Sequence, residues 1–424
     1  MDRTVSRERP ELTPGLLAAL GLVGAAGAVS TDLYLPAFPA LQADFDATPA
    51  AVQLTLTAYL LGSALGQLAI GTVSDALGRR RTLLLALGVF TATGFAAAAA
   101  PSLGWLLALR ALQGLSGSAG AALSRAVVAD LASGERAVRG VSALIAMMGL
   151  GPVVASPLGA LLASWGGWRA ALLGLAVIAA AMFAVALFAI PESLPRASRH
   201  PASARRLLGN LGRLARDGAF LAYVLAFAFA YGALMVYIGS SSFIVQRVLG
   251  ASPFAYALSF SLGSIAFVTG AWLNGRIARR LGAHGALRLA QLAAGGAACA
   301  LLVLALAGAL DGPGALWAWA PLVCVFTAGC AAAMSDGSAL TLGRAAFAAG
   351  GGSAALGLVQ FSVGAAASPL GGLWGVDTAV PAAAGMVALT ALGAVAAALG
   401  GARERRSPPA GAAARAPGAP RGGA

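Results

Sequence analysis

The chain has 424 residues, of which 59% are hydrophobic and only 10% are charged, with a formal net charge of +13 and a mean hydropathy of +0.83. Soluble domains carry about 25% charged residues, so this composition excludes a soluble protein and predicts an integral membrane protein. The positive charge does not indicate nucleic-acid binding, because the arginines lie between apolar stretches and in the tails. We expect no cofactor, metal or nucleic acid as a partner, and no enzymatic activity.

Twelve apolar stretches approach the roughly 20 residues that a spanning helix needs. They lie near 15–37, 51–73, 82–101, 103–126, 140–163, 168–190, 219–241, 254–275, 286–308, 316–342, 353–373 and 379–400. The sequence therefore predicts an all-α membrane protein with twelve transmembrane helices in two six-helix halves.

These stretches divide the chain into five segments. We expect an N-terminal tail at 1–14, a first half at 15–190, a linker at 191–218, a second half at 219–400 and a disordered tail at 401–424. Leu207, Leu211 and Leu214 would share one face of a helix among arginines, which predicts an interfacial amphipathic helix in the linker.

The basic residues are distributed unevenly between the two sides of this layout. Every basic residue other than histidine is arginine, and 25 of these 28 fall in the tails or in loops on one side. Since cytoplasmic loops are enriched in arginine and lysine, we expect both termini in the cytoplasm. The halves also repeat, because Ala155–Gly159 and Ala367–Gly371 have the same sequence at equivalent positions. Repeated halves are typical of transporters with a site between them.

Away from the ends of the expected spans, the first half has two charged residues, Asp32 in the first span and Arg110 in the fourth. Ionisable residues inside a membrane are costly and are functional candidates by default. The two lie at similar depth, so they would form a pair if their helices line one cavity. Such a carboxylate could exchange a proton or bind a cationic substrate. The alternative is that both side chains reach the membrane surface.

The loop at 71–81 reads Gly-Thr-Val-Ser-Asp-Ala-Leu-Gly-Arg-Arg-Arg between two spans. We expect Gly71 and Gly78 to allow close helix approach and a tight turn, and Asp75 to pair with a cation at a helix end. Arg79 is the first of three arginines that hold the loop in the cytoplasm. The alternative, a simple basic anchor, does not explain the two glycines and the aspartate at this spacing.

The fifth span contains Gly151, Pro152, Pro157 and Gly159. Small residues permit close helix contact, and prolines bend a helix by removing donors, although an ordinary kinked helix would also have this composition. Asp336 in the tenth span either faces the cavity or lies in a wet end of its helix, and we favour the second.

Three motifs resemble those of major facilitator superfamily transporters. They are the 71–81 loop, the R-x-x-Q-G sequence at Arg110–Gly114, and the D-x-Y-L-P-x-x-P sequence at Asp32–Pro39, which is similar to the Bcr/CflA subfamily of multidrug exporters. The 151–159 run partly resembles a glycine-proline motif of antiporters in the same superfamily. The resemblance implies a bacterial inner-membrane protein that exports amphipathic or cationic drug-like compounds in exchange for protons.

The resemblance also implies roles for individual residues. Arg110 would tune proton coupling at Asp32, and Asp75, Arg79 and Asp130 would form a conformational latch. The weaker candidates for lining the substrate cavity are Tyr34, Tyr59, Gln113, Tyr231, Met235, Gln360 and Phe361. The expected partners are a small molecule, protons and lipid, with the chain a monomer. The competing functions are a dedicated metabolite or amino-acid exporter and, in another class, a membrane receptor that does not transport.

Overall fold

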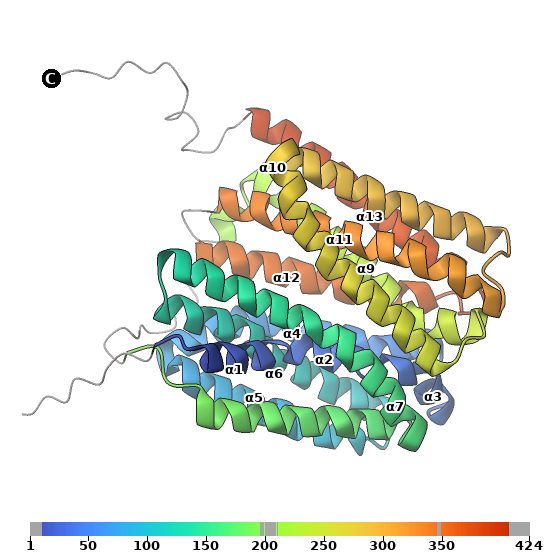
Figure 1. Cartoon of the computed structure of the whole chain (residues 1–424), viewed down its shortest axis with the longest axis horizontal. Coiled ribbons are helices and arrows are strands. Elements are labelled where there is room, and N and C mark those ends of the chain that lie inside the picture. Colours follow the sequence, from blue (N-terminus) through green and yellow to red (C-terminus); the bar gives the residue numbers. More distant parts are fainter. Residues whose placement is uncertain (1–10, 196–198, 200–208, 210, 346–348, 407–424) are drawn as a thin grey trace, which may run out of the picture.

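Helices account for nearly all of the computed structural model, which describes residues 11–195, 199, 209, 211–345 and 349–406 (Figure 1). The first half comprises α1 (Pro14–Gly24), α2 (Ala26–Asp32), η1 (Leu35–Ala37), α3 (Phe38–Asp44), α4 (Pro49–Leu77), α5 (Arg79–Ala98), α6 (Leu103–Leu131) and α7 (Gly134–Ala189). The second half comprises α9 (Gly218–Phe243), the π-helical turn η3 (Ile244–Val248), α10 (Pro253–Leu306), η4 (Pro313–Ala315), α11 (Leu316–Arg344), α12 (Ala349–Ala367), η6 (Ser368–Gly372) and α13 (Val380–Arg406).

The number of membrane passes follows from breaks in the two longest helices. Nine of the described helices are long and apolar enough to cross a membrane. Two of them, α7 and α10, reverse direction at glycines, since Gly167 has φ 65° and Gly282 has φ 71°, so each makes two passes. The 29-residue α6 adds a further pass, and it is less apolar because it carries Arg110 and Asp130. The described residues therefore make the twelve passes that the sequence predicts.

Local signals in the sequence explain where several helices begin. The side chains of Thr48, Ser102 and Ser252 each accept a hydrogen bond from a backbone N–H in the first turn of the helix that follows. Proline comes directly after Thr48 and Ser252, where its missing N–H is not needed. These caps fix where α4, α6 and α10 begin.

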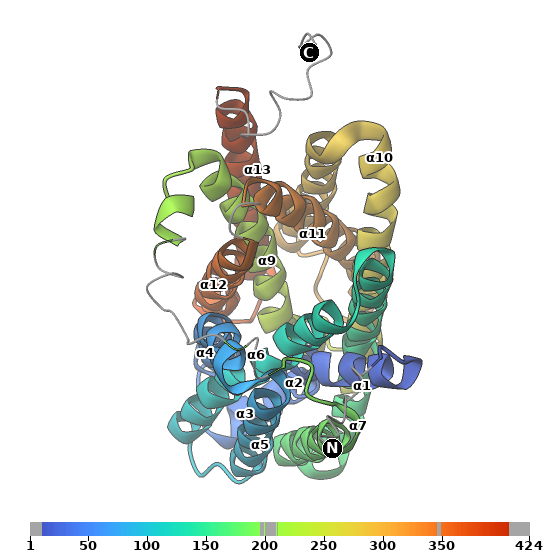
Figure 2. The same cartoon turned by 90° about the vertical axis from the view of Figure 1, so that its left-hand side faces the viewer.

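The halves form two helical bundles that lie side by side (Figures 1 and 2). Helix α4 of the first half lies along α12 of the second, and α7 lies along α10 (Figure 2). We call the end with the Gly78 turn, the Gly282 turn and the end of α13 the arginine end. The opposite end, where Trp105 and Trp317 lie, is the tryptophan end. These names are used for the two faces below.

Hydrogen bonds join the halves in the region nearer the tryptophan end. Gln53 Nε2 donates to the Gly239 carbonyl oxygen at 3.0 Å, and Gln246 Nε2 donates to the Pro36 carbonyl oxygen at 3.0 Å. Gln53 is completely buried. At the arginine end, by contrast, no ion pair between two described residues joins the first half to the second. The halves are therefore fastened together toward the tryptophan end in this conformation.

The arginine end of the second half is held by Asp217, which caps α9. Its carboxylate accepts hydrogen bonds from the Ala219 and Phe220 backbone N–H groups and from Arg344 Nε at 2.7 Å. Partial burial raises the pKa of Asp217, but the hydrogen bonds from Arg344 and the backbone outweigh burial and lower this pKa below its usual value. This ion pair ties the end of α11 to the start of α9.

Three details differ from the sequence-based expectations. The first span is not continuous over 15–37, because α1 and α2 meet at a kink and α2 ends at Asp32, before the chain turns through η1. Residues 401–406 belong to α13 and not to a disordered tail, whereas 407–424 lie outside the described residues. Leu207 of the expected linker helix also lies outside them, while Leu211 and Leu214 pack near the start of α9.

Candidate functional site

A cavity of about 420 Å³ lies between the two halves. Its walls comprise Gly24, Gly27, Ala28, Thr31, Asp32, Tyr59, Leu60, Ser63, Gln67, Gly117, Ser118, Ala121, Ile145, Met148, Gly149 and Pro152 from the first half, and Tyr231, Leu234, Met235, Tyr237, Ile238, Phe260, Gly263, Ser264, Phe267, Val268, Thr327, Met334, Gln360 and Phe361 from the second. This volume falls within the range of small-molecule sites.

Most of the residues expected to line a cavity lie in its wall. These are Tyr59, Tyr231, Met235, Gln360 and Phe361. Tyr34 and Gln113 are instead fully buried behind the wall. Tyr34 shares a 2.8 Å hydrogen bond with Thr55, and Gln113 accepts a 2.5 Å hydrogen bond from Arg110. These two side chains therefore support the wall and do not form it.

Among the described residues, Asp32 is the only acidic or basic side chain in the wall of this cavity. It is the last residue of α2, and it is 4% exposed. Its Oδ1 accepts a 2.9 Å hydrogen bond from the hydroxyl of Thr31. No cation of the described residues forms an ion pair with it. A buried carboxylate without a cationic partner is costly when ionised, so this site favours binding of a proton or a cationic ligand.

Arg110 contacts Ser30, two residues before Asp32, but does not form an ion pair with Asp32 itself. Its Nη1 donates to Ser30 Oγ and its Nη2 donates to the Ser30 carbonyl oxygen, both at 2.9 Å. The guanidinium carbon lies 4.4 Å from the ring centroid of Tyr34 and 4.6 Å from that of Tyr59. The direct pair suggested by their similar depth is thus not formed here. Arg110 instead holds the backbone two residues before Asp32.

The glycine- and proline-rich part of α7 packs against this same segment. A Cβ at Gly159 would lie only 1.6 Å from the Leu33 carbonyl oxygen, so the helix touches the backbone directly after Asp32. Gly151 lies farther along the same contact, where a Cβ would be 3.5 Å from Ala25. Pro152 lines the cavity, and Pro157 lies inside α7 between it and Gly159. The glycines let α7 lie against the break in the first span.

The residues expected to form a latch meet at the arginine end of the first half. Arg79 Nη1 donates to Asp75 Oδ1 at 2.5 Å, and Arg79 Nε donates to Asp130 Oδ2 at 3.2 Å. The Arg79 backbone N–H donates to Glu192 Oε1 at 2.9 Å, and Ser193 Oγ donates to Asp130 at 2.7 Å. This cluster connects the ends of α4 and α6 to the segment after α7.

The two glycines of the loop have different environments. Gly78 has φ 100°, a conformation that favours glycine, and the chain reverses there between α4 and α5. Gly71 was expected to allow close helix approach, but a Cβ there would meet no atom within 4 Å. That expectation is wrong for this conformation, because the flank of α4 at Gly71 is open.

Asp336 lies between helices of the second half, away from the cavity wall. Its Oδ1 accepts a 2.9 Å hydrogen bond from Asn274 Nδ2 of α10, and the residue is 4% exposed. It therefore neither faces the cavity nor lies in a wet helix end, as the sequence had suggested.

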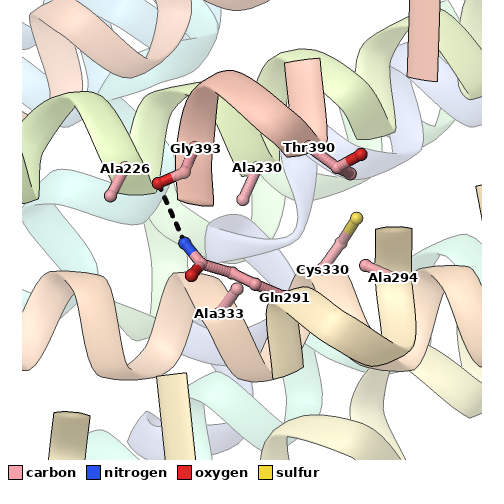
Figure 3. Close-up of a pocket in the computed structure, with 8 residues that line it drawn as sticks. All are labelled: Ala226, Ala230, Gln291, Ala294, Cys330, Ala333, Thr390 and Gly393. Carbon is pink, nitrogen blue, oxygen red and sulfur yellow. Dashed lines mark hydrogen bonds between the residues drawn. The ribbon is translucent and has the colours of Figure 1, made fainter. Parts of the chain in front are cut away.

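A separate cavity of about 10 Å³ lies within the second half (Figure 3). At this cavity, Gln291 Nε2 donates a 3.0 Å hydrogen bond to the Gly393 carbonyl oxygen (Figure 3). Cys330 and Thr390 also line it. Its volume suits about one water molecule. The cavity between the halves is therefore the candidate site.

Comparison with known proteins agrees with this geometry. The sequence matches the family described as Major Facilitator Superfamily over residues 20–372. The chain belongs to the major facilitator superfamily. It is 33% identical to the Bacillus subtilis protein "Uncharacterized MFS-type transporter YdgK" over 67% of this chain and 71% of that one. It is 29% identical to the "Bicyclomycin resistance protein homolog" of Haemophilus influenzae over 66% and 69% of the two chains.

Solved structures share the same fold. A bacterial homologue of the human lysosomal transporter Spinster, in an inward-facing and unoccupied conformation, matches with a TM-score of 0.70 at 16% identity, covering 93% of this chain and 98% of that one. The superfamily and the resemblance to Bcr/CflA-type exporters are confirmed by these matches. The protein is a multi-pass membrane transporter of small molecules and not an enzyme.

Several residues of the cavity and of the latch were not predicted from the sequence. Gln67 and Thr327 are polar residues within spans and could have been found by that signal. Tyr237 and Phe260 belong to spans without a charged residue, where no clear periodicity separates the cavity face from the lipid face. Glu192 was missed at the latch because its partner, the Arg79 backbone, is 113 positions away in the chain.

Asp75→Asn is expected to lower the transport rate by roughly two- to fivefold while the protein still folds and inserts. The change removes the anion from a half-exposed ion pair with Arg79, which contributes about 0.2–1 kcal/mol, and leaves a side chain of the same size. The measurement is export per inserted molecule. Glu135→Gln is the matched control, because its ion pair with Arg139 is long and highly exposed. If Asp75→Asn transports at the wild-type rate, the 71–81 loop serves only to fix the orientation of the chain in the membrane.

Proposed function

We propose that this transporter exports small amphipathic or cationic drug-like compounds in exchange for protons, with the cavity exposed to the two sides of the membrane in turn. The observation that carries the proposal is the solitary Asp32 carboxylate in an otherwise uncharged cavity between two repeated halves. A cationic substrate and a proton would compete for this one carboxylate. Such competition couples the export of one to the entry of the other.

The composition of the cavity wall favours drug-like compounds over amino acids. An amino acid carries a carboxylate as well as an ammonium group, and its recognition needs a cation or several donors. In the part of the chain that the structure describes, no arginine, lysine or histidine lines the cavity. The wall contains aromatic residues and methionines, which adapt to varied apolar shapes. The relative named for bicyclomycin resistance supports a role in drug export.

The residues of the site have distinct parts in this proposal. Asp32 would carry the proton or contact the cation. Arg110 would hold the backbone at Ser30 and so fix where the Asp32 carboxylate lies. Asp75, Arg79 and Asp130 would hold the arginine end of the first half in one arrangement. The chain would act as a monomer, with lipid and protons as its other partners and no nucleic acid.

The test is transport by purified protein in proteoliposomes with an imposed pH gradient. A permeant aromatic cation should move against its gradient when protons flow the opposite way, and a protonophore should abolish this movement. Movement of the cation that is indifferent to the pH gradient would contradict proton coupling. Failure to move any organic cation would contradict the proposed substrate class.

Both termini are expected to lie in the cytoplasm of a bacterial inner membrane. The reason is that 25 of the 28 arginines would then lie on the cytoplasmic side. Tags fused to residues 1 and 424 should therefore be protected from an impermeant label in intact cells and labelled after permeabilisation. Labelling of either tag in intact cells would contradict this orientation.

A further inference from the structure

The two halves contribute chemically different walls to the cavity. Polar groups from the first half include Thr31, Asp32, Ser63 and Gln67, and Tyr59 is the one aromatic side chain among the described residues of that half that lines the cavity. Every lining phenylalanine comes from the second half, together with two tyrosines and two methionines: Phe260, Phe267, Phe361, Tyr231, Tyr237, Met235 and Met334. A ligand between the halves therefore meets the carboxylate on one side and most of the aromatic rings on the other.

The aromatic wall is held in place by ring contacts behind it. Tyr237 stacks on Phe260 with centroids 6.1 Å apart and an interplanar angle of 12°. The Tyr237 ring also contacts Trp319 and Phe326, at centroid distances of 6.4 and 6.2 Å. Because Trp319 and Phe326 are almost completely buried, they fix the Tyr237 ring. The wall is thus a preformed aromatic surface.

A second aromatic pair continues this surface on the neighbouring helices. Tyr231 of α9 and Phe361 of α12 meet edge to face, with centroids 5.8 Å apart and an interplanar angle of 86°. The described residues offer no hydrogen-bond partner to the hydroxyls of Tyr231 and Tyr237. Both tyrosines line the cavity, so a ligand could supply the missing partner.

The charged wall presents its carboxylate without the nearby arginine. Arg110 is completely buried and is not part of the cavity wall. Its guanidinium lies between the rings of Tyr34 and Tyr59, and it donates to Ser30 and Gln113. A ligand in the cavity therefore contacts the anion of Asp32 and is separated from the cation behind it.

We propose that the cavity binds organic cations in one orientation, with the cationic group at Asp32 of the first half and an aromatic body against the Tyr237–Phe260 and Tyr231–Phe361 pairs of the second. The inference rests on the proposed export of amphipathic cations and specifies how one is held. Charge recognition and shape recognition then belong to different halves. The preferred substrate is a cation that carries at least one aryl group.

The test uses three probes that separate charge from aromaticity: tetraphenylphosphonium (an aryl cation), tetrabutylammonium (an alkyl cation) and triphenylphosphine oxide (a neutral aryl compound). Binding to the purified full-length protein is measured by titration calorimetry. Phe361→Leu should weaken both aryl probes roughly 3- to 10-fold, because it removes a ring contact, and leave tetrabutylammonium within about twofold. Asp32→Asn should weaken both cations and spare the neutral probe.

The controls separate this inference from the proposed function. Phe95→Leu makes the same substitution at an exposed position outside the cavity and should change nothing. Phe260→Leu provides a second test of the aromatic wall. Equal losses for alkyl and aryl cations in both phenylalanine variants, or loss of the neutral probe in Asp32→Asn, would overturn the orientation. If the wild type binds none of the probes, the proposed substrate class itself is wrong.

Discussion

Asp32→Asn is expected to abolish export that is driven by a pH gradient, while binding of uncharged substrates survives. An amide has the size of the carboxylate but cannot gain or lose a proton, so it cannot alternate between two states of charge. Of the described residues that line the cavity, Asp32 alone is acidic or basic, so none of its neighbours in that wall can replace it. The direct measurement is proton release when a cationic substrate is added to the detergent-solubilised protein.

Asp46→Asn is the matched control for this substitution. Asp46 is exposed, lies in the loop that follows the first span, and has φ 46°, which asparagine tolerates. It should release protons and transport like the wild type. Proton release from Asp32→Asn at the wild-type level would place the coupling carboxylate elsewhere. Asp336 would then be tested next, although it bonds to Asn274 outside the cavity wall.

The fold was predictable because every helix that crosses a membrane needs a long apolar run, and such runs are visible in the sequence. Apolar runs of spanning length gave twelve passes, and glycines at Gly167 and Gly282 provide the reversals within α7 and α10. The break in the first span was not predicted, because Leu33 and Tyr34 are apolar enough to continue a helix. The break coincides instead with Pro36 in η1, and α7 packs against it, with Gly159 contacting the Leu33 backbone from 126 positions away.

The candidate site was only partly predictable, because its contacts are decided by side-chain geometry. Depth along the helix placed Asp32 and Arg110 at one level, but depth says nothing about which groups face each other. Arg110 found its acceptors in Ser30, whose hydroxyl and carbonyl are both within 2.9 Å. Likewise, the motif at 71–81 named Asp75 and Arg79 but could not indicate Glu192, which approaches only after the first half has folded.

Gly159→Ala is expected to reduce transport more than Gly151→Ala, although both glycines belong to the same motif of α7. A Cβ at position 159 would lie 1.6 Å from the Leu33 carbonyl oxygen, so either α7 or the backbone after Asp32 must move. Overpacking of this kind costs about 1–3 kcal/mol of stability. Because the displaced backbone carries Asp32, we expect gradient-driven export to fall by roughly tenfold or more.

Gly151→Ala separates the effect of this contact from that of helix propensity. Its Cβ would lie 3.5 Å from Ala25, an ordinary van der Waals distance, and alanine favours helix over glycine by about 1 kcal/mol. Its thermal stability in detergent should therefore match or slightly exceed that of the wild type, and its export should change far less than that of Gly159→Ala. Equal export by the two variants would mean that the contact between α7 and Leu33 does not position Asp32. Gly159→Ala could also lose stability while the molecules that remain folded export at the full rate. In that case the contact between α7 and Leu33 would contribute to folding and not to transport.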